Sequence, residues 1–256
     1  MSNIEILNVN PDNIHKMGVY CIKNLKAEGA VNKMEWFLSQ YESGLRMKIA
    51  FIQGKQAGFI EYMPAEIAWR PVEADNYLFI QCIGIFIKDA RNKNLGSSLI
   101  ESCTKDALDQ NKAGVCTMTS DGAWIAGKSL FEKNGFVQAE KQGRFELMVK
   151  QFDKKSSQPK LIDWSKSLAQ YNGWNLVYAN QCPWHVKSVQ DLTKASAKRG
   201  IELKVVLLKS SSGIKNAPSG FGTFSLIRDG RLIEDHYLSK TRFENILDKE
   251  LNLRKK

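Results

Sequence analysis

The sequence predicts an α/β protein made of two successive units. Along the whole chain, apolar residues switch between a period of two and a period of about 3.6, as in alternating strands and helices. A polar stretch without periodicity, residues 153–160, separates two such series. The length of 256 residues also fits two cores, because domains commonly run to about 100–150 residues. We therefore expect one domain over residues 1–152 and a smaller one over residues 161–256.

The first unit is predicted to begin with helices and to continue with a hairpin. Apolar residues at helical spacing predict helices over residues 14–25 and 34–41. Two β-prone runs, residues 47–52 and 57–62, flank a turn that contains Gly54. Because glycine suits tight turns, this pattern predicts a β-hairpin.

The middle of the first unit alternates strands and helices. Residues 77–87 are nearly all apolar, which predicts a strand covered on both faces. Residues 95–108 then have the 3.6-residue period of an amphipathic helix. The remaining predicted elements are a strand at 115–118, a helix at 124–133 and a closing strand at 145–149.

The second unit repeats the α/β pattern on a smaller scale. Pro183, at a first helical position, opens the first of two predicted helices. A hairpin is predicted around Asp229 and Gly230, because this dipeptide favours a tight turn. The predicted order is a strand at 176–179, a helix at 183–195, a strand at 202–208, hairpin strands at 223–227 and 231–235, and a helix at 240–251.

Composition and charge limit the functional classes. The net charge of +10 favours polyanionic partners, and nucleic acid, an anionic cofactor and a merely solvated basic surface all fit it. Nucleic acid is not favoured, because the basic runs lack interleaved aromatic residues. The five cysteines are scattered without a Cys-x-x-Cys pair, so neither a disulfide framework nor a metal site is predicted. No apolar run has the length of a membrane span, and we expect a cytoplasmic protein.

The turn between residues 87 and 95 has the chemistry of an anion site. Where a buried strand ends and a helix begins, unpaired backbone N–H groups and the positive end of the helix dipole point outward. Gly96 would let a ligand approach the backbone, and Arg91 and Lys93 supply charge. Ser97 and Ser98 add hydroxyl donors. The alternative is an ordinary turn with solvated basic side chains.

Two stretches resemble the GNAT acetyltransferase superfamily. Arg91 to Gly96 is similar to its acyl-CoA loop, Arg/Gln-x-x-Gly-x-Gly/Ala, with Asn94 in place of the first glycine. Asparagine is the non-glycine residue that best tolerates a left-handed backbone. Lys128 to Phe136 resembles the family's later Leu-Tyr-Glu-Lys-x-Gly-Phe segment. The resemblance covers about residues 4–149 and implies a mixed central sheet that splays after the long strand, with acetyl-CoA in the wedge.

The resemblance also implies which residues bind acetyl-CoA. Backbone groups of the strand end would meet the pantetheine, the following loop would hold the pyrophosphate, and the later helix would line the cofactor. These residues are Phe86, Ile87 and Lys88 for the pantetheine, Arg91, Asn92, Lys93, Asn94, Leu95, Gly96, Ser97 and Ser98 for the pyrophosphate, and Lys128 and Phe131 along the cofactor.

Acyl transfer to an amine requires a neutral amine, an oxyanion stabiliser and a proton for the departing thiolate. Phe131 stands where the family commonly has a tyrosine that gives this proton, so the general acid is unassigned. Glu61 lies near the end of a strand, where the family often places a carboxylate, and is the candidate general base. The alternative for Glu61 is a solvated charge at a strand end. Trp69 and Arg70, in the loop 63–76, are expected either to shape the acceptor pocket or to form ordinary surface.

The second unit carries Cys182 at the start of a helix, where the dipole should lower the pKa of the thiol. The unit resembles a thioredoxin-like domain, with His185 in place of the second cysteine, which rules out a dithiol cycle within the motif. An acyltransferase followed by such a module is similar to YoaP-type proteins. Cys182 is a candidate reactive thiol or a buried small hydrophobe. His185 is expected at the helix surface, with a role as base as the alternative.

Three functional hypotheses stay open. The first is an N-acetyltransferase that transfers an acetyl group from acetyl-CoA to a primary amine, in a small molecule or peptide, by direct attack in a ternary complex. The second is a CoA-binding sensor without turnover, suggested by Phe131 and Asn94. The third is a thiol-dependent module in which Cys182 accepts or relays a group. A homodimer is also left open.

Overall fold

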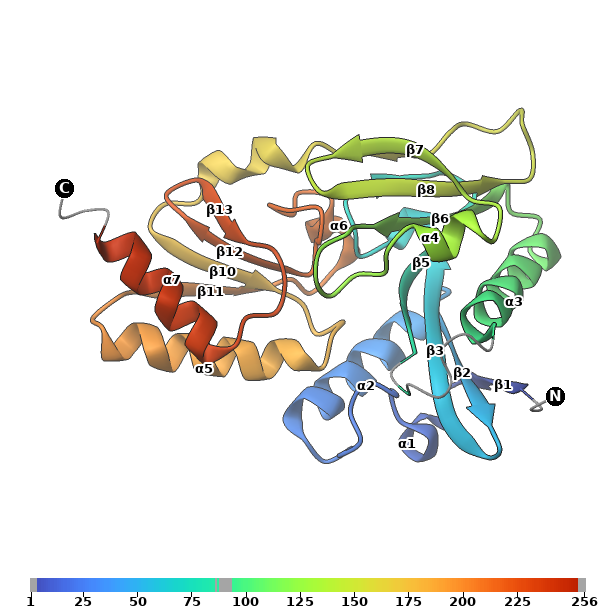
Figure 1. The fold of residues 1–256 in the computed structure, drawn as a ribbon, viewed down its shortest axis with the longest axis horizontal. Helices are drawn as coiled ribbons and strands as arrows, with labels where there is room; N and C mark the ends of the chain where they lie inside the picture. Colours follow the sequence, from blue (N-terminus) through green and yellow to red (C-terminus); the bar gives the residue numbers. More distant parts are fainter. Residues whose placement is uncertain (1–3, 86, 88–93, 253–256) are drawn as a thin grey trace.

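The computed structural model describes residues 4–85, 87 and 94–252, and its first part is a seven-stranded sheet of strand order β1-β2-β3-β5-β6-β8-β7. Only β5 and β6 are parallel, and the other neighbours are antiparallel, so the sheet is mixed as expected (Figure 1). Its strands are β1 (Ile4–Val9), β2 (Arg46–Ile52), β3 (Lys55–Pro64), β5 (Tyr77–Gly84), β6 (Gly114–Thr119), β7 (Val137–Gln142) and β8 (Phe145–Gln151).

Helices cover this sheet on both faces because its central strands are apolar on both sides. Leu78 and Ile80 of β5 pack with the apolar face of α3 (Leu95–Asp109). The intervening Tyr77 and Phe79 face the opposite side, where the C-terminal part of the chain covers them. The helices α1 (Ile14–Met17), α2 (Glu28–Tyr41) and α4 (Ser129–Glu132) and the short 3-10 helix η1 (Ala65–Ile67) complete the first part.

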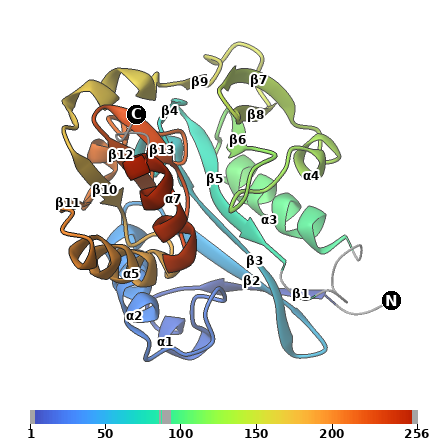
Figure 2. The ribbon, with the colours of Figure 1, turned by 60° about the vertical axis from the view of Figure 1, so that its left-hand side comes forward.

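The second part is a four-stranded sheet of order β11-β10-β12-β13. β10 is parallel to β11 and antiparallel to β12, and β12 and β13 form the predicted hairpin. Figure 2 shows α5 and α7 packed together on one side of this sheet. The elements are η3 (Trp164–Gln170), β10 (Trp174–Tyr178), α5 (Trp184–Lys198), β11 (Leu203–Leu207), α6 (Ser211–Ile214), β12 (Phe224–Arg228), β13 (Arg231–Glu234) and α7 (Lys240–Asn252).

One hydrophobic core runs through both parts. Phe79 and Leu147 of the first sheet belong to the same buried cluster as Leu176 and Phe224 of the second. The short strands β4 (Val72–Glu73) and β9 (Lys160–Leu161) also pair across the junction, so residue 160 of the expected linker lies in a strand. The two parts are therefore packed as one body at this seam.

Two glycines allow the backbones of the two parts to approach closely. A Cβ at Gly29 of α2 would collide with the carbonyl oxygen of Pro183, which precedes α5. A Cβ at Gly222 would lie 2.8 Å from the carbonyl oxygen of Trp69, and Gly222 also has a φ of +71°. Side chains at these positions would push the parts of the seam apart.

Several predicted elements differ from the structure. The helix predicted over residues 14–25 ends at Met17, because Gly18 follows with a φ of +73°. The helix predicted over 124–133 is reduced to α4, since Trp124 has a φ of +68° that no helix accepts. The prediction also missed the two edge strands β1 and β7, of which β7 is rich in polar residues. None of the helices in the described part of the chain has the length and apolarity needed to cross a lipid bilayer.

Candidate functional site

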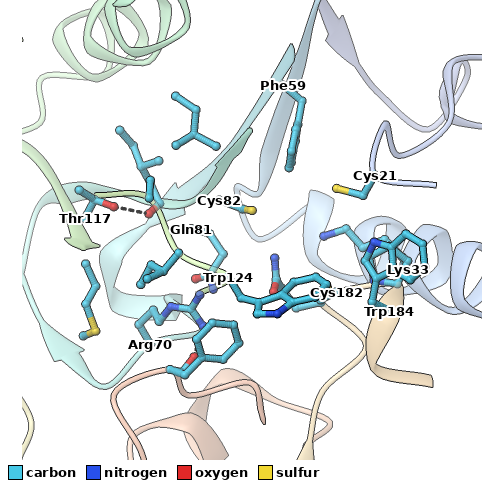
Figure 3. A pocket seen from close by; sticks show the side chains of 18 of the residues that line it. Cys21, Lys33, Phe59, Arg70, Gln81, Cys82, Thr117, Trp124, Cys182 and Trp184 are labelled. Atoms are coloured by element: carbon cyan, nitrogen blue, oxygen red, sulfur yellow. Dashed lines mark hydrogen bonds between the residues drawn. The ribbon is translucent and has the colours of Figure 1, made fainter. Parts of the chain in front are cut away.

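The sheet opens between β5 and β6. These strands pair only from Tyr77 with Gly114 to Ile80 with Thr117. Beyond this point β5 continues beside β3, whereas β6 continues beside β8. The hydroxyl of Thr117 donates a hydrogen bond of 2.9 Å to the carbonyl oxygen of Ile80 at the fork (Figure 3). The predicted wedge after the long strand is therefore present.

The start of α3 lies beyond the end of β5, as the loop motif requires. Asn94 has a φ of +56°, which is the left-handed backbone expected at the position of the missing glycine. Its side-chain oxygen accepts a hydrogen bond of 3.1 Å from Lys133. Ser97 accepts a hydrogen bond of 3.1 Å from the side-chain amide of Asn134. Ser97 and the neighbouring Ser98 are both half-buried. Asn94, Ser97 and the first turn of α3 thus lie together with the segment after α4.

Some of the predicted cofactor residues fall outside the described part of the chain. Ile87 is described and is exposed. Leu95 is buried beneath the first turn of α3 and packs in the core. The predicted cofactor residues outside the described part are Phe86, Lys88, Arg91, Asn92 and Lys93.

The proposed reason for Gly96 is wrong. We expected the missing Cβ to leave the backbone open to a ligand, but a Cβ there would meet Leu130 at 3.0 Å and Ile85 at 3.5 Å. Gly96 therefore makes room for the side chains that pack α3 against α4. The N–H groups of the α3 start remain the feature suited to an anion.

Phe131 and Lys128 lie on the other side of the wedge. Phe131 is buried, stacks edge to face on Phe136 with ring centroids 5.4 Å apart, and lines a cavity. Lys128 is not among the residues that line this cavity, and its ammonium group lies 3.3 Å from Glu146. Of this predicted pair, the structure therefore brings only Phe131 to the cavity.

A cavity of about 450 Å³ begins at the fork and extends to the C-terminal part (Figure 3). Its wedge end is mostly apolar. Its other end combines groups from α2, the loop before β5, and the start of α5. The wedge end is lined by Ile80, Ile83, Ile85, Thr117, Met118, Ile125, Ala126 and Phe131, and the far end by Cys21, Lys33, Phe59, Arg70, Gln81, Cys82, Trp124, Gln181, Cys182, Pro183, Trp184 and Phe221.

Glu61 is fully buried beside this far end, so the alternative of a solvated strand-end charge is wrong. It forms an ion pair with Lys33 of α2. Its second oxygen accepts a hydrogen bond of 2.8 Å from Gln181 of the C-terminal part. A bulge between β3 and β5 follows Glu61 directly, and bulges commonly re-aim side chains near functional sites. Glu61 therefore connects both parts of the chain at the cavity.

Cys182 lines the cavity, but its predicted activation is wrong. Burial raises the pKa of the thiol, and this outweighs the lowering by a backbone hydrogen bond from Trp184. Burial likewise raises the pKa of Cys82 to about 12. Figure 3 shows Cys21, Cys82 and Cys182 on different elements around the same space. The thiols of Cys82 and Cys182 are therefore protonated at neutral pH.

The three other predicted residues, Arg70, Trp69 and His185, differ in where they lie. Arg70 lines the cavity as expected, whereas Trp69 is fully buried and packs edge to face on Trp36 at 5.4 Å between centroids. His185 is buried and not at the helix surface, and its Nδ1 lies 2.9 Å from the carbonyl oxygen of Ala179. Burial lowers the pKa of His185 to about 4, so the imidazole is neutral.

Sequence reasoning missed Lys33, Gln81 and Gln181. Lys33 belongs to a helix whose apolar face was predicted, and nothing in its spacing marks it as buried. Gln81 is the extra residue at the bulge, and its amide bonds both backbone groups of Trp69, at 3.1 and 3.3 Å. A polar residue inside a long apolar strand was the one available signal, because such strands rarely bury an amide without a partner.

The amino-acid sequence is similar to that of a known protein over nearly the whole length of both chains. The chain is 29% identical over 250 residues to the uncharacterized N-acetyltransferase YoaP of Bacillus subtilis strain 168, covering 94% of this chain and 98% of that protein. The chain is similar to a named N-acetyltransferase through both of its parts. This similarity agrees with the YoaP-type resemblance seen in the sequence. No family model matches the chain.

Solved structures with partial likeness are also acetyltransferases. A GNAT-family acetyltransferase from Streptococcus pneumoniae is 21% identical, with a TM-score of 0.43, and covers 59% of this chain and 100% of its own. The PaiA N-acetyltransferase of Thermoplasma acidophilum, solved with coenzyme A, is 17% identical, with a TM-score of 0.42, and covers 59% of this chain and 99% of its own.

Proposed function

We propose that this protein is an N-acetyltransferase that transfers an acetyl group from acetyl-CoA to a primary amine by direct attack in a ternary complex. The observation that carries this proposal is the continuity of the cavity, which begins in the wedge between β5 and β6 and ends among polar groups of both parts. The whole-length similarity to a named N-acetyltransferase supports the same acyl group.

The wedge suits the cofactor because of how the strands separate. Past Ile80, β5 and β6 no longer pair with each other, so backbone groups there are available to a pantetheine amide. The start of α3 supplies N–H groups and a positive dipole end for the pyrophosphate. Bound acetyl-CoA would supply the acetyl group as an activated thioester at the inner end of the wedge.

The polar end of the cavity suits the acceptor. Glu61 is the candidate base: Lys33, which lines the cavity, would pass one of its protons to Glu61 and take the amine proton in its place, while Gln181 holds the carboxylate. Phe131 offers no proton to the leaving thiolate, and no tyrosine is among the described residues that line the cavity. The general acid is therefore not assigned to a tyrosine.

Calorimetry with CoA and acetyl-CoA, followed by a panel of primary amines, tests this function. We expect saturable binding and release of CoA above the rate of hydrolysis with at least one amine. Ile83→Trp should fill the wedge and weaken CoA binding by about tenfold or more, whereas Val137→Trp on the exposed face of β7 should not. A lack of binding heat with both CoA and acetyl-CoA would exclude the proposal. Binding of CoA without turnover of any amine would instead favour the hypothesis of a CoA-binding sensor.

A group relay through Cys182 is a second candidate, because this thiol lines the same cavity as the wedge residues. In this route the sulfur of Cys182 would take the acetyl group as a thioester while CoA leaves as its thiol. The amine would then take the acetyl group and return the thiol. Intact-protein mass spectrometry after mixing with acetyl-CoA alone should show one added acetyl group, absent in Cys182→Ser. Full activity of Cys182→Ser would exclude the relay.

The C-terminal part is proposed to be a thioredoxin-like domain. Its strand order and its β-α-β-α-β-β-α sequence support this, with β10 inside the sheet and β13 at the edge. Gln181 and Cys182, which precede α5, face the first part at the cavity. The domain would therefore serve as one wall of the acceptor pocket and not as a separate redox enzyme.

A further inference from the structure

Arg70 is a buried cation in the acceptor end of the cavity. Its side chain comes from the loop before β5, and the residue is only 5% exposed. One nitrogen, Nη1, donates to the carbonyl oxygen of Phe221 and, at 3.2 Å, to the hydroxyl of Thr223. The guanidinium also lies 4.3 Å from the ring centroid of Phe221. The C-terminal part therefore fixes the orientation of Arg70.

Nothing in the described part of the chain neutralises Arg70. No described carboxylate lies within 4.0 Å of its guanidinium. Glu61 is close enough to influence Arg70, but Glu61 is already paired with Lys33. Burial lowers the pKa of Arg70 only to about 10, so the group is charged at neutral pH. The polar end of the cavity thus holds one uncompensated positive charge.

The free side of the guanidinium faces the cavity. Nε and Nη2 make no hydrogen bond to the described residues, yet neither belongs to the buried polar atoms that lack a partner there. They are therefore accessible from the cavity, which Arg70 lines (Figure 3). A guanidinium edge with two free N–H directions binds a carboxylate in bidentate fashion.

From this geometry we infer that the acceptor amine also carries a carboxylate, which Arg70 binds. The inference rests on the proposed acetyltransferase function and names its substrate class. A single uncompensated charge matches a monoanion better than a dianionic phosphate. The aromatic rings of Trp124, Trp184 and Phe221 line the same end and suit an apolar body. The acceptor class is therefore a small amino acid with an apolar side chain or spacer.

Matched pairs of amines that differ only in the carboxylate test this inference. Suitable pairs are leucine with 3-methylbutylamine, phenylalanine with 2-phenylethylamine, and 4-aminobutanoate with propylamine. In at least one pair, the carboxylated amine should have a kcat/KM about tenfold or more higher, as expected for hydrogen bonds to a charged group. Equal values in every pair, or higher values for the amines without carboxylate, would overturn the inference.

Variants of Arg70 decide whether this residue causes the preference. Arg70→Gln should remove the preference, so that the two members of each pair have similar kcat/KM values, and Arg70→Lys should retain part of it. Thr223→Val removes one tether of the guanidinium but keeps its charge, so the preference should persist. Circular dichroism would verify that each variant is folded. A preference that survives in folded Arg70→Gln would contradict the assignment.

Direct binding separates this inference from the proposed function. The same amine pairs are titrated into the wild-type protein saturated with CoA, and binding is followed by calorimetry. Tighter binding of the carboxylated member without acetylation would support the anion site and count against acetyl transfer. Acetylation without any carboxylate preference would support the function and exclude the anion site.

Discussion

The two ends of the cavity are built in different ways. The wedge end comes from one stretch of the chain, since β5, β6, the loop after β6 and α4 all lie within residues 77–132. The acceptor end combines Lys33, Arg70 and Cys182, which are far apart in the sequence and come from both parts of the chain. A cofactor site can therefore be encoded by one local motif, whereas the acceptor site depends on the assembly of the whole fold.

Removal of the C-terminal part should have the largest effect. A chain of residues 1–152 would expose Tyr77, Phe79 and Leu147, which belong to the shared core. Because burial of each large apolar side chain contributes about 1.5–3 kcal/mol, we expect this fragment to lose cooperative urea unfolding. Supplying residues 153–256 as a separate chain should restore it in part. Cooperative unfolding and wild-type CoA affinity in residues 1–152 alone would mean that the two ends are independent.

Lys33→Met should destabilise the acceptor end strongly. The substitution leaves the buried carboxylate of Glu61 without its counter-charge. Loss of one partner of a buried ion pair commonly costs about 3–5 kcal/mol in the free energy of unfolding, measurable by urea denaturation. Lys33→Met combined with Glu61→Gln should recover part of this loss. Lys48→Met is the matched control and should cost less, because its partner Asp106 is partly exposed. A larger loss of unfolding free energy in Lys48→Met than in Lys33→Met would contradict the expectation.

The stability of the C-terminal part should fall in mild acid because of His185. Its folded-state pKa is about 4 owing to burial, whereas the unfolded value is about 6.5. The unfolded chain therefore binds a proton first, and stability is lost as the pH falls through about 6.5 towards 4. We expect a loss of about 2 kcal/mol between about pH 7 and 4.5, and His185→Gln should flatten this slope. A slope that stays as steep in folded His185→Gln would contradict this expectation.

Substitution of Asn94 should have the smallest effect. Glycine accepts the left-handed φ of this position without strain, so Asn94→Gly should change the free energy of unfolding by less than about 0.5 kcal/mol and keep the CoA affinity. Asn94→Val should cost about 1–2 kcal/mol, because a β-branched residue resists this conformation. Thermal unfolding and calorimetry measure both quantities. Equal stability of the glycine and valine variants would contradict the role assigned to the backbone.

Most of the fold could be predicted because its signals are local. Continuous apolar residues mark the strand in the run 77–87, a 3.6-residue period marks the helix from Leu95, and the turn at Gly230 marks the second hairpin. The edge strand β7 was missed because most of its residues are polar and all are exposed or half-buried. The early end of α1 depends on the backbone of Gly18, and helical spacing alone does not reveal such a stop.

The acceptor site was less predictable, because tertiary contacts decide it. Glu61 was found from its place at a strand end, but its burial depends on Lys33 and Gln181, which reach it from other elements. Cys182 was identified from its helix start, yet the surrounding protein raises its pKa and reverses the expected effect of the dipole. A local pattern gives the position of a titratable group, and its environment sets the charge.

The close approach at Gly29 and Gly222 has a consequence for how substrates enter. Because the backbones of the two parts approach closely at these points and the parts share one core, a hinge motion between them would have to open that core. Substrates and products are then expected to enter and leave the cavity through an opening of constant width. The partly exposed rings of Trp124 and Trp184 line the cavity, so we expect the distance between its walls, and not closure of the two parts, to limit the size of an acceptor.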